Sequence, residues 1–264
     1  MPFPLYDGPP LIDARRNAVA LLIGLLAGAF GGLVGLGGGV VMIPLLTSLL
    51  GLGQHKAHGT SLAALVFTGL AGSAAYWRDG NVDFTAALFL AIPAVLTAVA
   101  GAKFAHELPE SRLRRYLGVF LAFVSVMLLL KPIISPGAVV VGGVWKYAAL
   151  TITGGLAGFI SGMMGVGGGS IMVPAMVLLA GMGQHAAQGS ALMAMIPTAA
   201  FGARVHWRLG NVATDIPAGL LTGIIIGSYL GGKLAGFAPD FALRILLAAV
   251  LAYVGVGYAI RRAA

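Results

Sequence analysis

The sequence has little charge for its length. Only 9% of its 264 residues are charged, whereas 59% are hydrophobic, and the mean hydropathy is +0.96. A soluble domain carries about 25% charged residues. The chain therefore lacks the polar residues that would cover a globular surface, which excludes a soluble enzyme, a disordered protein and a nucleic-acid-binding protein. We expect an all-α polytopic membrane protein whose solvent is the lipid bilayer.

Cysteine is absent and acidic residues are few. The zero cysteine count excludes disulfides, iron–sulfur clusters and thiolate zinc sites. There are 8 Asp and Glu against 16 Lys and Arg, and Asp83 and Asp215 stand at the starts of apolar segments, which argues against a carboxylate proton relay deep in the membrane. The sequence shows no metal-ligand spacing, no nucleophile–base set and no P-loop. We therefore expect a protein that is not an enzyme and that needs no metal and no cofactor.

An internal repeat accounts for nearly the whole chain. When position 35 is placed on position 165, Gly35-Leu-Gly-Gly-Gly39 aligns with Gly165-Val-Gly-Gly-Gly169, and the alignment continues without a gap. Between 28–83 and 158–213, 24 of 56 positions are identical. The chain is therefore predicted to be a duplicated protein of two fused halves. The predicted boundaries are an N-terminal tail (1–16), a first repeat (17–131), a linker (132–146) and a second repeat (147–262).

Each half opens with a long stretch that carries no charge. The ranges 17–54 and 147–184 contain no Lys, Arg, Asp, Glu or His. As one helix, each stretch would be roughly 57 Å long, almost twice the hydrocarbon core of a bilayer. The glycine-rich motif lies at its middle, so we predict two helices joined at a tight glycine turn. Whether the short second helix crosses the membrane or re-enters is left open.

Three further apolar segments are expected in each half, at 57–77, 83–103 and 113–131 and at 186–207, 213–233 and 243–260. A hairpin adds zero or two crossings, so each half would cross the membrane an odd number of times. The two repeats would then have inverted topology. If one leg of each hairpin crossed and the other re-entered, the halves would instead be parallel.

The distribution of cations favours the inverted arrangement. It places eleven of the 16 Lys and Arg residues on the side of the N-terminus and five on the other side, against 9 and 7 for parallel halves. The positive-inside rule then predicts that both termini are cytoplasmic. The apolar run after Arg15 and Arg16 continues far past the length of a signal peptide, so we expect an uncleaved first membrane segment.

The glycine motif is the candidate site for a ligand. Glycines allow positive φ and close approach of a ligand, and a helix that begins at them presents free N–H groups to an anion. Secondary transporters place substrate sites at such discontinuous helices, although the glycines could also serve only a tight turn. The predicted substrate-binding residues are Gly37, Gly38, Gly39, Gly167, Gly168, Gly169, Ser170, Thr60, Ser61, Thr68, Ser190, Thr198 and Arg204.

Several of these positions have a structural alternative. The hydroxyls can bond to their own helix instead of a ligand, and Arg204, whose equivalent is Ala74, can extend to the membrane interface. His55 and His185 are equivalent residues that we expect at the interface rather than as ligands. Glycines repeat at intervals of four, which favours close helix packing; they are Gly24, Gly28 and Gly32 in the first half and Gly154, Gly158 and Gly162 in the second.

Three motifs together resemble the TauE/SafE sulfite exporter family. They are Gly35-Leu-Gly-Gly-Gly-Val-Val-Met-Ile-Pro44, Gln54-His-Lys-Ala-His-Gly-Thr-Ser-Leu62 and Tyr76-Trp-Arg-Asp-Gly-Asn-Val-Asp83, and each recurs at the equivalent place in the second half. The resemblance implies a multi-pass permease of the bacterial inner membrane for sulfite, sulfonates and related anions. The second copy departs from the pattern, with Gln188 in place of His58 and Ala213 in place of Asp83.

The residues and the resemblance together predict a secondary transporter for small anions, such as sulfite or an organosulfonate. Its site would lie at the membrane midplane between the two glycine breaks. The alternatives are an anion channel and a membrane assembly subunit without transport of its own. The expected partners are a small anionic substrate and the lipid bilayer, with no nucleic acid, and the sequence leaves homo-oligomer formation open.

Overall fold

A computed structural model describes residues 11–134, 142–213 and 218–237, together with single positions and short stretches between 239 and 257. In this part of the chain every regular element is an α-helix, so the predicted all-α class is confirmed. The helices are α1 (Leu11–Val34), α2 (Gly39–Leu49), α3 (Gln54–Arg78), α4 (Phe84–Glu107), α5 (Glu110–Ile134), α6 (Val144–Met164), α7 (Gly169–Leu178), α8 (Gln184–Arg208) and α9 (Ala218–Ala235).

The long helices have the length and apolar composition of membrane spans. By these measures five helices among the described residues could cross a bilayer, namely α1, α3, α4, α6 and α9. Large hydrophobic side chains cover their outward faces, and they include Leu22, Leu26, Leu88, Leu96 and Ile152, each more than half exposed. Such a surface suits lipid and not water. The protein is a multi-pass membrane protein.

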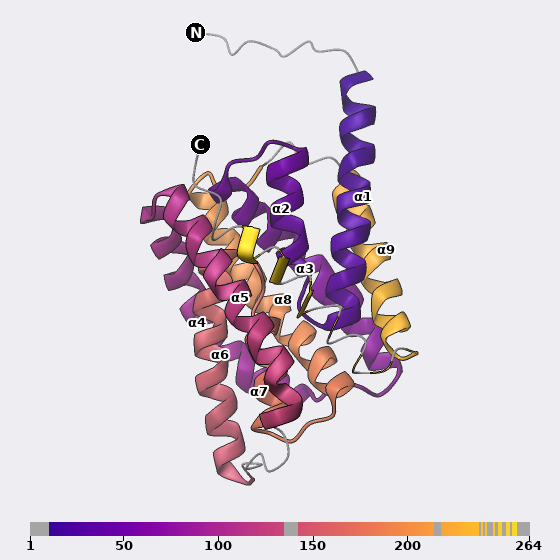
Figure 1. Ribbon diagram of the computed structural model, residues 1–264, viewed down its shortest axis with the longest axis vertical. Helices are drawn as coiled ribbons and strands as arrows, with labels where there is room; N and C mark the ends of the chain where they lie inside the picture. The colour runs from indigo at the N-terminus through magenta and orange to yellow at the C-terminus, as the bar shows by residue number, and fades with distance from the viewer. Residues whose placement is uncertain are drawn as a thin grey trace.

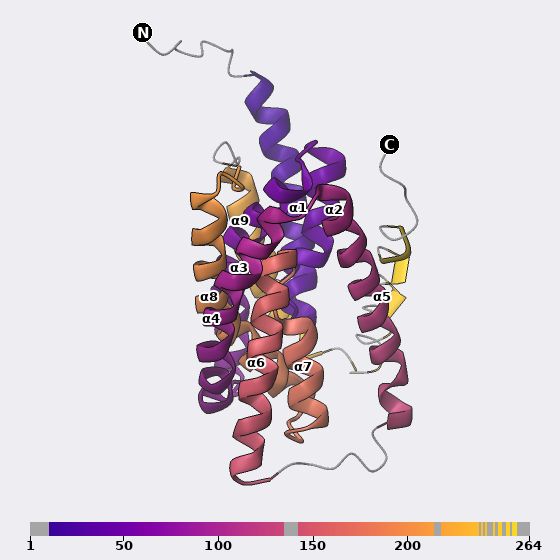
Figure 2. The ribbon, with the colours of Figure 1, turned by 90° about the vertical axis from the view of Figure 1, so that its left-hand side faces the viewer.

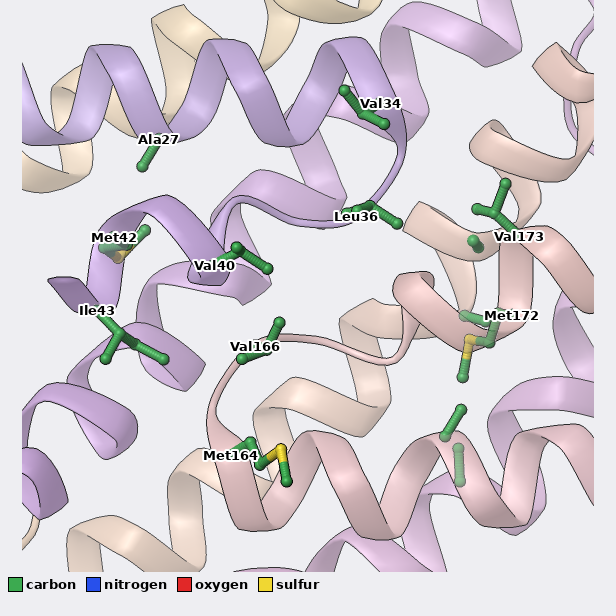
Figure 3. Packing of buried hydrophobic residues seen from close by; sticks show 14 of the residues in the cluster. Ala27, Val34, Leu36, Val40, Met42, Ile43, Met164, Val166, Met172 and Val173 are labelled. Atoms are coloured by element: carbon green, nitrogen blue, oxygen red, sulfur yellow. The ribbon is translucent and has the colours of Figure 1, made fainter. Parts of the chain in front are cut away.

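Glycine interrupts the first helix of each half where the sequence predicts a break. α1 ends at Val34 and α2 begins at Gly39, and the equivalent break separates α6 from α7. Gly37 and Gly167 both have φ of 87°, a left-handed conformation that side chains disfavour. The short helices α2 and α7 have 11 and 10 residues. In Figure 3, α2 runs back beneath α1 from the turn at Leu36, so the two helices form a hairpin.

Close helix packing follows the glycine stripes. A Cβ atom built on Gly28 would lie 2.6 Å from the carbonyl oxygen of Ile224 on α9, and one built on Gly162 would collide with the carbonyl oxygen of Ala98 on α4. Small residues let the backbones of α1 and α9, and of α6 and α4, approach each other. Figure 1 shows α1 beside α9 at one side of the bundle. The packing role predicted for both stripes agrees with these contacts.

The helices are arranged so that the breaks lie inside the bundle. Figure 2 shows α5 along one edge, with α3, α4, α8 and α9 towards the opposite side and α2 and α7 between. α3 and α8 pack against each other and against the breaks. Pro93 and Pro197 lie inside helices α4 and α8. The predicted segment 243–260 lies largely outside the described residues.

Candidate functional site

The two glycine breaks lie against each other in the interior. A Cβ atom built on Gly39 would lie 2.5 Å from the carbonyl oxygen of Gly165 and 2.8 Å from the Cα atom of Val166. In the reciprocal contact, a Cβ atom on Gly169 would collide with the carbonyl oxygen of Gly35. Figure 3 shows the two turns side by side. Backbones can approach this closely only because these positions carry no side chain.

Each break leads into a short helix that has no side-chain cap. The residues before α2 and α7 are Gly38 and Gly168, and neither helix has a side-chain hydrogen bond to its first N–H groups. These N–H groups have no partner within the helix, and the helix dipole adds partial positive charge there. Both N-termini are buried. The arrangement can bind an anion through backbone donors.

Ser170 lies at the N-terminus of α7 and has no hydrogen-bond partner among the described residues. Its side chain is 3% exposed, and its Oγ atom is buried. The equivalent residue of α2 is Val40, which is fully buried. A buried hydroxyl without a partner costs free energy, so Ser170 Oγ is an available donor beside the first N–H groups of α7.

Two aliphatic side chains fill the space between the breaks. A Cβ atom built on Gly37 would collide with the Cε atom of Met195 and would lie 2.7 Å from the Cδ2 atom of Leu65. A Cβ atom built on Gly167 would lie 2.7 Å from the same Cε atom of Met195. Leu65 and Met195 are equivalent residues of the two halves, and they form a cluster with Leu62 and Ala199. Their methyl groups therefore pack directly on both breaks. Neither residue could be predicted from the sequence, because nothing in a sequence marks an aliphatic residue as part of a site.

Of the predicted hydroxyl residues on α3 and α8, Ser61 reaches the breaks. It donates a 2.8 Å hydrogen bond to the carbonyl oxygen of Gly165. Its Oγ atom would lie 2.9 Å from a Cβ atom on Gly39, so it contacts both breaks. Thr68 and Thr198 are buried, but each donates to a carbonyl of its own helix, one turn earlier.

Thr60 and Ser190 hold the turns that follow α3 and α8. The backbone N–H of Ala213 donates a 3.0 Å hydrogen bond to Thr60 Oγ1, and that of Asp83 donates a 2.8 Å bond to Ser190 Oγ. Asp83 and Ala213 are equivalent residues, so each half holds the Gly-Asn-Val turn of the other. Arg204 is exposed on α8, and the structure does not bring it to the breaks.

The last turns of α1 and α6 are held by side chains that the sequence analysis did not select. Tyr76 Oη lies 3.0 Å from the carbonyl oxygen of Gly32 and 3.0 Å from Gln188 Oε1. At the equivalent place in the second half, His206 Nε2 lies 3.0 Å from the carbonyl oxygen of Gly162. His58, the equivalent of Gln188, also contacts α6. Tyr76 aligns with His206, and His58 aligns with Gln188, when the two repeats are superposed. A change from one polar residue type to another at equivalent positions is the sequence signal that could have identified them.

A cavity of about 820 Å³ lies along α1 and α2, away from the breaks. Arg15 and Arg16 line one part of it, and the remaining lining residues are apolar, among them Leu22, Leu26 and Leu49. Within the described part of the chain no group of three or more His, Cys, Asp or Glu side chains is arranged to bind a metal ion.

Several known proteins that are similar to this chain are named as probable membrane transporters. "Probable membrane transporter protein YunE" of Bacillus subtilis (strain 168) is 32% identical over 183 residues, which cover 61% of this chain and 67% of that protein. "Probable membrane transporter protein YdhB" of the same organism is 29% identical over 185 residues, covering 69% and 75%. A "Probable membrane transporter protein" of Xylella fastidiosa (strain 9a5c) is 32% identical over 177 residues, covering 65% and 67%. No solved structure matches the chain significantly.

A family model matches the part of the chain that contains the three motifs and their repeats. The model of the family described as "Sulfite exporter TauE/SafE" matches residues 20–258. This range includes both glycine breaks, α3, α8 and the two Gly-Asn-Val turns. The chain belongs to the TauE/SafE sulfite exporter family.

Proposed function

We propose that the protein is a secondary transporter for small anions, of which sulfite and organosulfonates are the preferred class. The observation that carries this proposal is the meeting of two uncapped, buried helix N-termini at the glycine breaks. The printed family description names sulfite export, and the relatives' names say that they are probable membrane transporters. A sulfonate group carries three oxygens, which can accept hydrogen bonds from several N–H groups at once.

The proposed site lies between Gly37–Gly39 of the first break and Gly167–Ser170 of the second. Backbone N–H groups would supply most of the donors, and Ser170 Oγ would add one. Ser61 stands beside both breaks and is the second hydroxyl that a ligand would meet. No lysine or arginine is needed among these donors, so the site avoids the cost of desolvating a permanent cation.

The remaining predicted residues support the site or lie outside it. Thr60 and Ser190 accept hydrogen bonds from the turns, and Thr68 and Thr198 donate to their own helices. We therefore propose that these four hydroxyls are structural. The exposed position of Arg204 gives it no contact with the proposed anion, and a role at the membrane interface fits its place on α8.

We further propose that residues 17–131 and 147–262 form two inverted repeats. Equivalent contacts recur in both halves, such as those of Gly39 and Gly169 with the opposite break. In Figure 1, α2 turns back towards the end of the bundle where α1 begins, whereas α7 points to the other end. This agrees with hairpins that enter from opposite sides. The cation distribution supports our further proposal that both termini lie on the cytoplasmic side of a bacterial inner membrane.

A carrier explains the arrangement at the centre better than a channel does. Leu65 and Met195 occupy the space between the breaks, so an anion can enter only after these side chains move. A protein that must rearrange for each anion saturates with substrate, whereas an open pore does not.

Two measurements on the purified protein test the proposal. Methanesulfonate binding is measured by calorimetry, and counterflow of labelled sulfonate is measured in liposomes. Gly168→Ala places a methyl group at the N-terminus of α7, where its nearest neighbours would be the flexible end of Met172 at 2.8 Å and Ala157 at 3.2 Å. We expect saturable binding and counterflow in the parent and a loss of at least tenfold in affinity in this variant.

Gly183→Ala is the matched control. Gly183 has an extended backbone, is exposed, and has nothing within 4 Å of a Cβ atom built on it. The affinity of this variant for methanesulfonate should equal that of the parent. An affinity unchanged in Gly168→Ala would place the anion elsewhere, and flux that rises without saturation would identify a channel.

A further inference from the structure

Four of the five histidines gather at one end of the bundle. His55 and His58 lie on α3, His106 at the end of α4 and His206 at the end of α8. The rings of His55 and His106 are 6.2 Å apart, and His106 Nδ1 lies 3.1 Å from Nδ2 of Asn211. His106 is exposed, His55 is half-buried, and His58 and His206 are fully buried. The imidazoles therefore lead from the surface into the interior.

The two buried histidines contact the end of α6, immediately before the second glycine break. His206 Nε2 lies 3.0 Å from the carbonyl oxygen of Gly162, and His58 Nδ1 lies 3.3 Å from that of Met163. The Cβ atom of His206 would lie 2.9 Å from one built on Gly59, the residue after His58. The two side chains thus lie side by side on consecutive carbonyls.

These contacts define which nitrogen of each ring carries hydrogen. A carbonyl oxygen only accepts hydrogen bonds, so His58 Nδ1 and His206 Nε2 must be the protonated nitrogens of neutral rings. The other two nitrogens, His58 Nε2 and His206 Nδ1, are buried and have no partner among the described residues. Each is a bare acceptor to which one proton can be added.

The first half has no titratable pair at the equivalent place. Tyr76 and Gln188 stand where the second half has His206 and His58, and they bond to each other and to the end of α1. Neither side chain is an imidazole, the group that binds a proton near neutral pH. A change of charge can therefore occur beside one break only.

The other charged groups on the surrounding helices face outwards. Those nearest this end, among the residues whose side chains the structure describes, are Lys56, Lys103, Glu107, Glu110, Arg112, Arg115, Arg204 and Arg208, and all are exposed. α7 has no charged residue, and the charged residue of α6 is Lys146 at its opposite end. The titratable groups that face the buried pair are thus His55 on α3 and His106 on α4. Among the described residues no buried carboxylate neutralises a proton at this pair.

We propose that His58 and His206 form a proton-binding site that couples proton movement to anion transport. His55 and His106 are the route by which the proton reaches it from the surface. An added proton makes an imidazolium next to the second glycine break, since the ring of His58 contacts the carbonyl oxygen of Met163, two residues before Gly165. The positive charge raises the affinity of the site for the anion, and the bound anion in turn raises the affinity for the proton.

Linkage makes this coupling reciprocal. One proton and one anion bind cooperatively, so that each anion is carried with one proton and its negative charge is offset. This inference rests on the proposed function, because it assigns the coupling ion to the same site. It predicts anion affinity about tenfold higher at low pH than at high pH.

The test measures proton uptake during anion binding. Purified protein in weak buffer with a pH-indicating dye is titrated with methanesulfonate, which stays ionised throughout. The parent should take up close to one proton per bound anion. The double variant His58→Gln with His206→Tyr copies the Gln188–Tyr76 pair that the other half already contains, so the pocket should accept it. It should bind methanesulfonate without proton uptake and with an affinity that no longer depends on pH.

His185→Gln is the control, because His185 lies on α8 at the other end and contacts the carbonyl oxygen of Ala235. Its proton uptake should equal that of the parent. Binding without proton uptake in the parent, or equal uptake in the double variant, would overturn the coupling and leave the anion site intact. Absence of both binding and counterflow in the parent would instead overturn the proposed function, and the coupling with it.

Discussion

Ser61 on α3 donates a 2.8 Å hydrogen bond to the carbonyl oxygen of Gly165, the first residue of the second glycine break. The bond joins a helix of the first half to the turn of the second half. The equivalent of Ser61 is Ala191, which cannot make such a bond. The two breaks have the same positive φ at Gly37 and Gly167, but Gly38 is left-handed whereas Gly168 is not. They also differ in the polar groups around them.

Replacing Ser170 with valine should weaken anion binding without loss of stability. Valine is the residue at the equivalent position, Val40, so its shape suits a break of this kind. The change removes a hydrogen bond to a charged ligand, worth about 1.5–3 kcal/mol, which corresponds to roughly ten- to hundredfold in affinity. Calorimetry with methanesulfonate measures the change. Equal affinity in parent and variant would show that Ser170 makes no contact with the anion.

Replacing Thr60 with valine should lower stability, because it leaves the buried N–H of Ala213 without its acceptor. An unpaired buried donor costs about 1–3 kcal/mol. Thr198→Val is the control, since Thr198 donates to a carbonyl of its own helix and its loss leaves no buried N–H unpaired. Thermal unfolding in detergent compares the two. Equal unfolding midpoints in the Thr60→Val and Thr198→Val variants would mean that other contacts hold the turn at Ala213.

Truncating Met195 to alanine should open a path between the breaks. The Cε atom of Met195 packs on both Gly37 and Gly167, so its removal leaves space where the resting protein is closed. We expect an increased leak of sulfonate from loaded liposomes that does not require exchange. Met193→Ala is the matched control, because Met193 is a partly buried methionine on the same helix. No increase in leak would show that the closure lies elsewhere.

The absence of cysteine allows a direct test of the topology. Gly142 and Arg112 are both exposed, and they lie near the start of α6 and of α5 respectively. Under the inverted arrangement Gly142→Cys faces the outside and Arg112→Cys the cytoplasm. A membrane-impermeant maleimide should label the first and not the second in intact cells stripped of their outer membrane. The reverse pattern would contradict cytoplasmic termini.

Much of the fold could be predicted from the sequence because the bilayer constrains it strongly. The charge-free stretches 17–54 and 147–184 are too long to be single helices in a hydrocarbon core about 30 Å thick, so the glycine motifs had to mark breaks. The stripe at Gly24, Gly28 and Gly32 likewise indicates a close helix neighbour. The stripe packs on α9, which belongs to the other half of the chain. The sequence does not identify this partner, because the apolar face of any helix could pack against such a stripe.

The site was predicted only where the backbone itself is the functional group. Gly37, Gly38 and Gly167 have positive φ, and Gly39 and Gly169 lie where the opposite break leaves no room for a side chain. A glycine motif in the sequence indicates both needs. Hydroxyls were ambiguous, since Thr60 and Thr198 look alike in sequence but bond to different partners. His58 and His206 belong to different halves of the chain, and only the packing of α3 and α8 on the end of α6 brings them together.

The position of a bound anion tests the central proposal most directly. Crystals grown with bromomethanesulfonate would reveal the bromine by its anomalous scattering. We predict one peak between the breaks, with the sulfonate oxygens about 3 Å from backbone nitrogens of Gly39 and Gly169 and from Ser170 Oγ. A peak confined to the cavity beside Arg15 and Arg16, with none between the breaks, would contradict it.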